Sequence, residues 1–361
     1  MNRNANSQSA GQIIGKINGQ QVVGLDIAKS VFQLHTVDMD TGEIVNQQLK
    51  RAKVSEHFAN RQPCLIGIEA CGGAHHWARQ LQAQGHSVRL IHAKAVRPFV
   101  SGNKTDATDA RAIWLAVQQP GTKFVGIKTE EQQATLVLHR QRELLMKIKA
   151  MQTNALRGLL YEFGATFARG KNALFGEIEA ALEALVGKGA VPQYVADSLR
   201  EQAQRIKTLV EDIKRIEQRL QQRLKGNADM KRVAQIPGVG LLTATAAIAT
   251  MGEASAFKSG REFCAWLGLV PRQSGTGGRV KLLGISKRGD TYLRTLLIHG
   301  ARSVLTHAKQ PGPWLEQIKT RRPANVVIVA QAAKMARAIW AVTAKQQDYQ
   351  QGYQSSRPLA A

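Results

Sequence analysis

Short apolar runs alternate with amphipathic stretches in the first third of the chain. Runs with strand spacing predict strands at 21–26, 31–37, 43–49, 64–69 and 87–91. Helical spacing predicts helices at 53–60, 74–84 and 106–117. Three successive strands, followed by alternating helix and strand, predict a mixed α/β sheet of the ribonuclease H type over residues 21–127.

Two long amphipathic patterns follow, at 130–163 and 197–225. In the second, apolar residues from Leu199 to Leu224 step by threes and fours, missing one position at Glu217, which resembles coiled-coil heptads. One interpretation is an arm that forms an oligomer. The other is a pair of antiparallel helices packed within one chain, and the pattern alone favours neither.

From residue 231 to 345 the pattern is helical, with two interruptions. Residues 236–240 (IPGVG) resemble the turn of a helix-hairpin-helix, in which Gly238 and Gly240 would offer backbone N–H groups to a DNA phosphate. Residues 271–281 (PRQSGTGGRVK) lack periodicity and predict a flexible, glycine-rich loop.

Four carboxylates stand in positions that suit a divalent cation. Asp26 and Glu69 each close a predicted buried strand, where a lone carboxylate is costly. Asp106 and Asp109 lie three apart at a predicted helix start and therefore share one helix face. Carboxylate oxygens suit Mg²⁺. The alternative for the last two is local: Asp106 as helix N-cap and Asp109 as a favourable charge at the helix N-terminus.

The charge of the chain is strongly basic and uneven. The 361 residues, enough for two or three domains, carry a net charge of +24. Residues 1–120 carry 13 basic and 8 acidic residues, whereas residues 231–345 carry 18 and 4. A polyanion partner is the natural inference, with nucleic acid the first candidate, and the alternatives are a solvated basic surface or a membrane-surface patch. The membrane ranks below nucleic acid because no basic stretch has an amphipathic membrane profile.

Cysteines and apolar runs give little sign of export or of membrane insertion. The three cysteines, Cys64, Cys71 and Cys264, match neither a zinc site nor a disulfide framework, which favours a reducing cytosol. Residues 1–20 lack the apolar core of a signal peptide. No run approaches the roughly 18 apolar residues of a membrane span, so we expect no membrane partner.

A second candidate for chemistry is Ser274, in the glycine-rich segment. Basic side chains surround it in sequence: Arg272, Arg279 and Lys281. Arginines can clamp a phosphate, and a hydroxyl held there could attack phosphorus to form a covalent enzyme–DNA ester. From composition alone a simple phosphate-contacting loop is favoured, and Thr276 and Ser286 would be rival nucleophiles.

Motifs along the chain resemble those of the DEDD transposases of the IS-one-ten insertion-sequence family. The N-terminal motifs are residues 23–29 (VGLDIAK), 68–72 (IEACG) and 103–111 (NKTDATDAR). The C-terminal ones are residues 236–240, Ser274-Gly275, and 286–290 (SKRGD) before Leu293-Arg294. They occur in the family's order over about residues 21–345, and residues 74–77 (AHHW) look like the IS-eleven-eleven subgroup.

The resemblance implies a set of parts. These are a disordered tail at 1–20, a RuvC-like metal-binding domain at 21–127, a helical coiled-coil region at 128–229, a mainly helical transposase domain at 230–345 and a flexible tail at 346–361. It further implies a tetrad of Asp26, Glu69, Asp106 and Asp109 around Mg²⁺, or Mn²⁺ in its place, with Ser274 as the nucleophile. Nucleic-acid contacts are expected from Lys104, Arg111, Gly238, Gly240, Arg272, Arg279, Lys281, Lys287 and Arg288.

The implied activity is excision and site-specific insertion of an insertion sequence in the prokaryotic cytoplasm, at the nucleoid. Expected partners are double-stranded DNA, a structured non-coding guide RNA encoded by the element, and further copies of the chain, as a dimer or tetramer. Three alternatives remain: a related DNA invertase, a RuvC-like hydrolytic nuclease or Holliday junction resolvase, and a non-catalytic nucleic-acid-binding protein.

Overall fold

A computed structural model describes residues 16–17, 19–38, 40–168, 171–310 and 312–352. The chain divides into two compact units, residues 1–130 and 131–361. Most of the predicted tail at 1–20 and the end of the predicted tail at 346–361 lie outside the described residues. The finer division into five parts remains a prediction.

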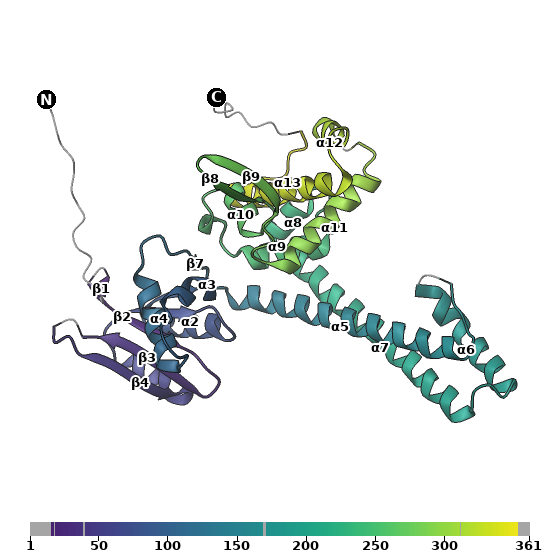
Figure 1. The fold of residues 1–361 in the computed structure, drawn as a ribbon, viewed down its shortest axis with the longest axis horizontal. Helices are drawn as coiled ribbons and strands as arrows, with labels where there is room; N and C mark the ends of the chain where they lie inside the picture. Colours follow the sequence, from purple (N-terminus) through teal and green to yellow (C-terminus); the bar gives the residue numbers. More distant parts are fainter. Residues whose placement is uncertain (1–15, 18, 39, 169–170, 311, 353–361) are drawn as a thin grey trace. The chain divides into compact units, whose positions relative to one another are not determined.

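The first unit is built on a mixed sheet, as predicted (Figure 1). Its strands are β1 (Lys16–Ile17), β2 (Gln20–Asp26), β3 (Val31–Val37), β4 (Ile44–Lys50), β5 (Leu65–Glu69), β6 (Ser87–Ile91) and β7 (Phe124–Val125). The order is β4-β3-β2-β5-β6-β7, with β1 paired to β2 beside this path. Strands β2, β5 and β6 run parallel, and the other pairs are antiparallel.

Helices cover both faces of this sheet. η1 (Arg51–Lys53), α1 (Val54–Ala59) and α2 (Ala74–Ala83) lie on the side of the core that holds Val23, Leu25, Phe58 and Trp77. α3 (Ala93–Val96), η2 (Arg97–Phe99) and α4 (Asp106–Gln118) lie on the side that holds Val22, Leu65 and Ile113. The helices predicted at 53–60, 74–84 and 106–117 are therefore confirmed within one or two residues.

Two glycines in register let α4 lie directly on the sheet. Gly24 on β2 pairs with Gly67 on β5. A Cβ at Gly24 would stand 2.2 Å from the carbonyl oxygen of Ala110, and one at Gly67 would stand 2.9 Å from Cβ of Val117. Real Cβ atoms do not approach so closely, so α4 owes its depth on the sheet to the missing side chains.

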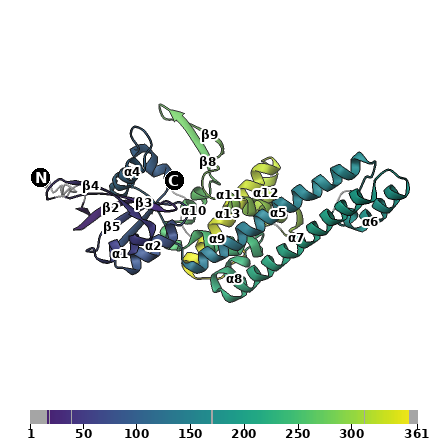
Figure 2. The same ribbon diagram turned by 90° about the horizontal axis from the view of Figure 1, so that it is seen from below.

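The second unit begins with an antiparallel pair of long helices, α5 (Glu130–Glu162) and α7 (Gln193–Gly226), joined through α6 (Lys171–Gly187) (Figures 1 and 2). Arg142 forms an ion pair with Glu217 at 2.8 Å, and Nε2 of Gln202 donates to the carbonyl of Gln152. Residues later in α5 therefore pair with residues earlier in α7, so the two helices pack antiparallel within one chain.

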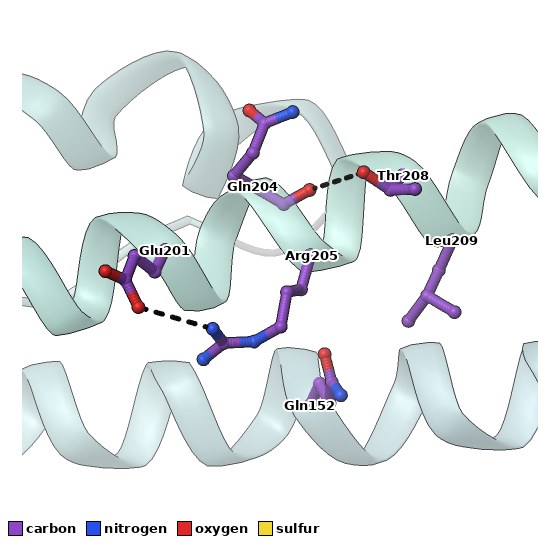
Figure 3. A pocket seen from close by; sticks show the side chains of 6 residues that line it. All are labelled: Gln152, Glu201, Gln204, Arg205, Thr208 and Leu209. Carbon is purple, nitrogen blue, oxygen red and sulfur yellow. Dashed lines mark hydrogen bonds and ion pairs between the residues drawn. The ribbon is translucent and has the colours of Figure 1, made fainter.

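A groove of about 560 Å³ lies between α5 and α7 (Figure 3). On α7, Arg205 pairs with Glu201 at 3.6 Å and the Thr208 hydroxyl donates to the carbonyl of Gln204. On α5, the buried Oε1 of Gln152 has no hydrogen-bond partner among the described residues. These lining residues hold no general base against a nucleophile, so the groove is a gap in helix packing.

The rest of the second unit is a helical bundle. Its elements are α8 (Ala228–Ala234), α9 (Leu241–Met251), η3 (Ala254–Ala256), α10 (Gly260–Trp266), α11 (Thr291–His307), α12 (Pro313–Lys319) and α13 (Ala324–Lys345). Its core contains Val233, Phe263, Leu297 and Met335.

Helix α13 is long and apolar enough to cross a membrane, although no membrane span was expected from the apolar runs of the sequence. It packs on α8, α10 and α11 and contributes Ala332 and Ile339 to the core, which is the behaviour of a core helix.

The glycine-rich segment is a β-hairpin, so the prediction of a flexible loop was wrong. Strand β8 (Pro271–Thr276) pairs antiparallel with β9 (Arg279–Ile285). Gly277 and Gly278 both have positive φ, 56° and 78°, as a two-residue turn of type I′ requires. Gly-Gly between two short runs is therefore a turn signal here, and both strands are exposed along nearly their whole length.

Candidate active site

The four predicted acids come together at one edge of the first unit. Side chains alternate along a strand, so Asp26 shares a face of β2 with Gly24, and Glu69 shares the same face of β5 with Gly67. That face carries α4, whose first turn holds Asp106 and Asp109. Each strand therefore places a glycine under the helix and, two residues on, an acid beside its N-terminus.

Electrostatics reflect this convergence most clearly at Asp26. Burial, followed by the charges of Asp109, Asp106 and Glu69, raises the pKa of Asp26 to about 6, against a small opposing effect of Lys104. Three like charges acting on one half-buried carboxyl is the arrangement that a divalent cation relieves.

The interpretation of Asp106 as the N-cap was wrong. Thr105 caps α4: its hydroxyl accepts from the backbone N–H of Thr108 at 3.2 Å, and the Thr108 hydroxyl accepts from the backbone N–H of Thr105 at 2.9 Å. This capping box satisfies the helix end without a carboxylate. The alternative for Asp109 stands, because both Asp106 and Asp109 lie in the first turn of α4, where a negative charge is favourable.

The carboxylates fit a hard divalent cation by chemistry, because their donors are all oxygen. Among the described residues, however, no three His, Cys, Asp or Glu side chains lie close enough together to hold a metal ion. The acids are near enough to repel one another yet wider apart than a coordination shell. Nζ of Lys104 lies 4.0 Å from Oδ2 of Asp109, so a cation stands beside the acids, and Arg111 is exposed on α4 two residues after Asp109.

In the second unit, the hairpin sorts its side chains onto two faces. Ser274 pairs with Lys281, and Thr276 pairs with Arg279, so two hydroxyls and two cations share one face. On the other face Val280 and Leu282 are 65% and 64% exposed. Gly275 stands opposite Val280, where a Cβ would lie 2.2 Å from the carbonyl oxygen of Arg279.

Comparisons with known proteins agree with this layout. The model of the Transposase IS116/IS110/IS902 family matches residues 230–315, and the DEDD transposase model for IS110, described as "Transposase", matches residues 23–164. A "Probable family 20 transposase" of Pseudomonas aeruginosa is 44% identical over 91% of this chain and 98% of its own length. The "Transposase for insertion sequence element IS1111A" of Coxiella burnetii is 39% identical over 92% of each chain.

The chain belongs to the IS110 family of transposases. It is thus an enzyme of a family that cleaves and rejoins DNA, as the motifs predicted. The "Transposase for insertion sequence element IS1328" of Yersinia enterocolitica is also similar, at 36% identity over 89% of this chain and 96% of its own length. For an IS110 transposase the DEDD match implies a ribonuclease H-like first unit and suggests a divalent metal.

The root of the hairpin was missed from the sequence. Arg294 on α11 is buried: its Nη1 donates to the carbonyls of Leu267 and Arg288 at 2.9 and 3.0 Å, and its Nη2 donates to the Thr291 hydroxyl. Gly268 and Gly289, with φ of 74° and 81°, let the two legs of the hairpin touch backbone to backbone. Arg294 stood only in a predicted motif, six residues after Arg288, and its burial has no separate signal in the sequence.

The structure explains the glycine at position 238 by packing. Gly238 has φ of 86°, and a Cβ there would stand 2.8 Å from the carbonyl oxygen of Gly300 on α11. Gly240 is exposed at the N-cap of α9, where a Cβ would meet nothing within 4 Å. Phosphate contact by these two glycines remains a prediction, as do contacts by Arg272, Lys287 and Arg288, which are exposed in and beside the hairpin.

Proposed function

We propose that this transposase uses Asp26, Glu69, Asp106 and Asp109 to bind a divalent cation, Mg²⁺ or Mn²⁺, at the DNA phosphate that is cleaved. The observation that carries this proposal is the raised pKa of Asp26, caused by burial and by the other three acids. When bound, the cation would neutralise charge developing on the phosphate oxygens. The seating of α4 on Gly24 and Gly67, beside the two strand ends, supports this placement of the acids.

Ser274 is the proposed nucleophile. Its hydroxyl oxygen attacks phosphorus, an Oγ–P ester forms, the bond from phosphorus to one deoxyribose oxygen breaks, and the serine proton ends on that released oxygen. The number of phosphoester bonds is unchanged, so a second strand end can reverse the step and complete the joining. Lys281 and Arg279, on the same hairpin face, would balance charge on the phosphate in the transition state.

Burial separates the rival nucleophiles. The Ser286 hydroxyl is buried, without a hydrogen-bond partner among the described residues, and so is poorly placed to reach DNA. Thr276 lies exposed on the same face as Ser274 and is the rival that a test must address.

The test traps the ester on a nicked suicide substrate and separates products by denaturing electrophoresis. Wild type should give a slow-migrating protein–DNA species that Ser274→Ala lacks and Thr276→Val retains. An adduct that persists in Ser274→Ala would place the nucleophile elsewhere. Cleavage without any adduct in wild type would favour the hydrolytic nuclease or resolvase.

The wider activity follows from the family. We infer excision and insertion of an insertion sequence, directed by an element-encoded structured RNA, and the net charge of +24 supports large nucleic-acid partners. Inversion in place of transposition would use the same residues. The DNA on either side of the gene distinguishes these two, because a mobile element has recognisable ends.

Assembly of more than one copy is part of the proposal. Val137, Leu144 and Met151 are exposed on α5 at seven-residue spacing, on a helix whose other side packs on α7. An apolar stripe of this spacing suits a helix from a second copy. Leu144→Glu should lower the mass measured by light scattering, while Leu144→Met should not. An unchanged mass in Leu144→Glu would remove α5 as the interface.

A further inference from the structure

A pocket of about 310 Å³ lies in the first unit beyond the C-terminal end of α4. Its walls include Ile17, Arg89, Val117 and Phe124, together with the turn that follows α4. A hydrogen bond holds this turn to the end of α4, because the Thr122 hydroxyl donates to the carbonyl of Ala116 at 3.1 Å. The volume is at the lower end of the ~300–1,000 Å³ range of small-ligand pockets.

The pocket pairs an arginine with an exposed aromatic ring. Cζ of Arg89 stands 4.7 Å from the centre of the Phe124 ring, which is 38% exposed. Arg89 forms no ion pair in the described part of the chain, and no acid lines the pocket there. An aromatic ring and a guanidinium plane are the surfaces on which unpaired bases stack, and the guanidinium can also bind phosphate.

The surrounding charge also favours a nucleic-acid strand. From residue 87 to 128 the chain carries seven basic residues, and its two acids are Asp106 and Asp109. α4 leads from the pocket at its last turn to those acids at its first turn, about 20 Å at 1.5 Å per residue. One strand could therefore run along this unit from the acids to the pocket.

We propose that the Arg89–Phe124 pocket binds one unpaired nucleotide, its base stacked on the exposed part of the Phe124 ring and its phosphate facing Arg89. This site is separate from the acids and goes beyond the proposed function, since stacking requires neither cleavage nor Ser274. The bound strand can be single-stranded RNA or an unpaired DNA end, because every base has a π-face.

The experiment uses the full chain with short oligouridine and oligodeoxyuridine strands, each carrying one photoreactive 5-iodouracil. Irradiation should crosslink the base to the peptide containing Phe124, as located by mass spectrometry. Phe124→Leu should weaken binding about tenfold, the effect of losing one stacked base. Arg89→Gln should also weaken binding and lower the log–log salt slope by about 0.7, the loss of one phosphate contact on a single strand.

A matched control is available in the same chain. Phe163 is also 38% exposed, but no cation stands over its ring among the described residues. Phe163→Leu should bind like wild type, and Phe124→Tyr, which keeps a stacking ring, should retain affinity and confirm that the unit is folded. Preference for RNA would assign the pocket to RNA, and preference for DNA to an unpaired DNA end; either supports the site.

Two results would overturn the proposal. One is a crosslink that maps away from the β6–β7 region in wild type. The other is an equal loss of affinity in Phe124→Leu and Phe163→Leu. Both results leave the adduct test of Ser274 untouched, so failure here is distinguishable from failure of the proposed function.

Discussion

Replacing the Asp26 carboxylate should raise the stability of the protein and abolish its activity. Its pKa of about 6 lies above the ordinary 3.8, so its charge destabilises the folded chain as pH rises through that interval. At neutral pH without divalent cations, Asp26→Asn should melt higher than wild type. Added Mg²⁺ or Mn²⁺ should raise the melting temperature of wild type more than that of the variant, which should no longer cleave DNA.

The control for this prediction is Glu43→Gln, which removes an exposed acid of the same unit. It should melt like wild type and respond to the cation as wild type does. An Asp26→Asn protein with the full response to Mg²⁺ would show that the acids do not share a cation.

The buried side chain of His139 should make the second unit less stable at acidic pH. Its Nε2 lies 3.0 Å from the Thr245 hydroxyl, which itself donates to the carbonyl of Leu241, and its Nδ1 lies 3.0 Å from the Tyr292 hydroxyl. This fixes a neutral ring that donates through Nε2 and accepts at Nδ1. Burial, then Arg142, lowers the pKa of His139 to about 4 from 6.5.

Because the folded pKa is the lower one, this contribution is complete above pH 6.5 and is lost as pH falls toward 4. At pH 5 the unit should lose about 2 kcal/mol relative to pH 7. Urea midpoints at the two pH values measure the loss, which should shrink in His139→Gln. An equal loss in both proteins would assign the acid lability to other groups.

The chemistry of single residues was predictable where it depended on strand ends and helix spacing. Asp26 and Glu69 end buried strands, and Asp106 and Asp109 are three apart, so their convergence followed from the pattern once the sheet order was right. The capping by Thr105 was hidden because an Asp at the next position has the same preference. The burial of the Ser286 hydroxyl has no signal in the local sequence.

The contact between α4 and the sheet carries the next prediction. Gly24→Ala would place a Cβ 2.2 Å from the Ala110 carbonyl oxygen, so the helix must shift away from the strands. We expect a loss of about 1–3 kcal/mol in unfolding free energy, typical of overpacking, together with a strong loss of cleavage. Gly126→Ala, where a Cβ meets nothing within 4 Å, is the matched control.

Chemical denaturation and DNA cleavage measure the two effects. Full activity and stability in Gly24→Ala would mean that the helix tolerates the shift, and that the acids do not depend on its depth.

Elements with strong periodicity were predicted well. All five predicted strands, which are β2 to β6, and both long helices lie where apolar spacing put them. The hairpin was missed because two adjacent glycines also suit a flexible loop, whereas positive φ at both Gly277 and Gly278 makes a tight turn here. Strand β7 was not predicted, because its two residues are too few to show alternation. It forms by pairing with β6 at the edge of the sheet.

For the whole molecule, the charge predicts strongly salt-dependent binding. The region at 231–345, with 18 basic and 4 acidic residues, should release counterions on contact with phosphates. If it neutralises about six phosphates, affinity for duplex DNA should fall about a thousandfold between 50 and 200 mM salt. Filter binding or fluorescence anisotropy gives the slope. A flat log–log plot would mean that this charge only serves solubility.

The hairpin also determines where the chain can be opened. Its exposed strands leave the helical bundle only at the root closed by Arg294, while the bundle's core is formed by α9, α10, α11 and α13. A protease nick or an inserted tag at Gly277-Gly278 should therefore leave the bundle intact, with two fragments held together by its core. The part of this enzyme proposed to carry the nucleophile is thus also the one that can be cut, labelled or replaced without unfolding the rest.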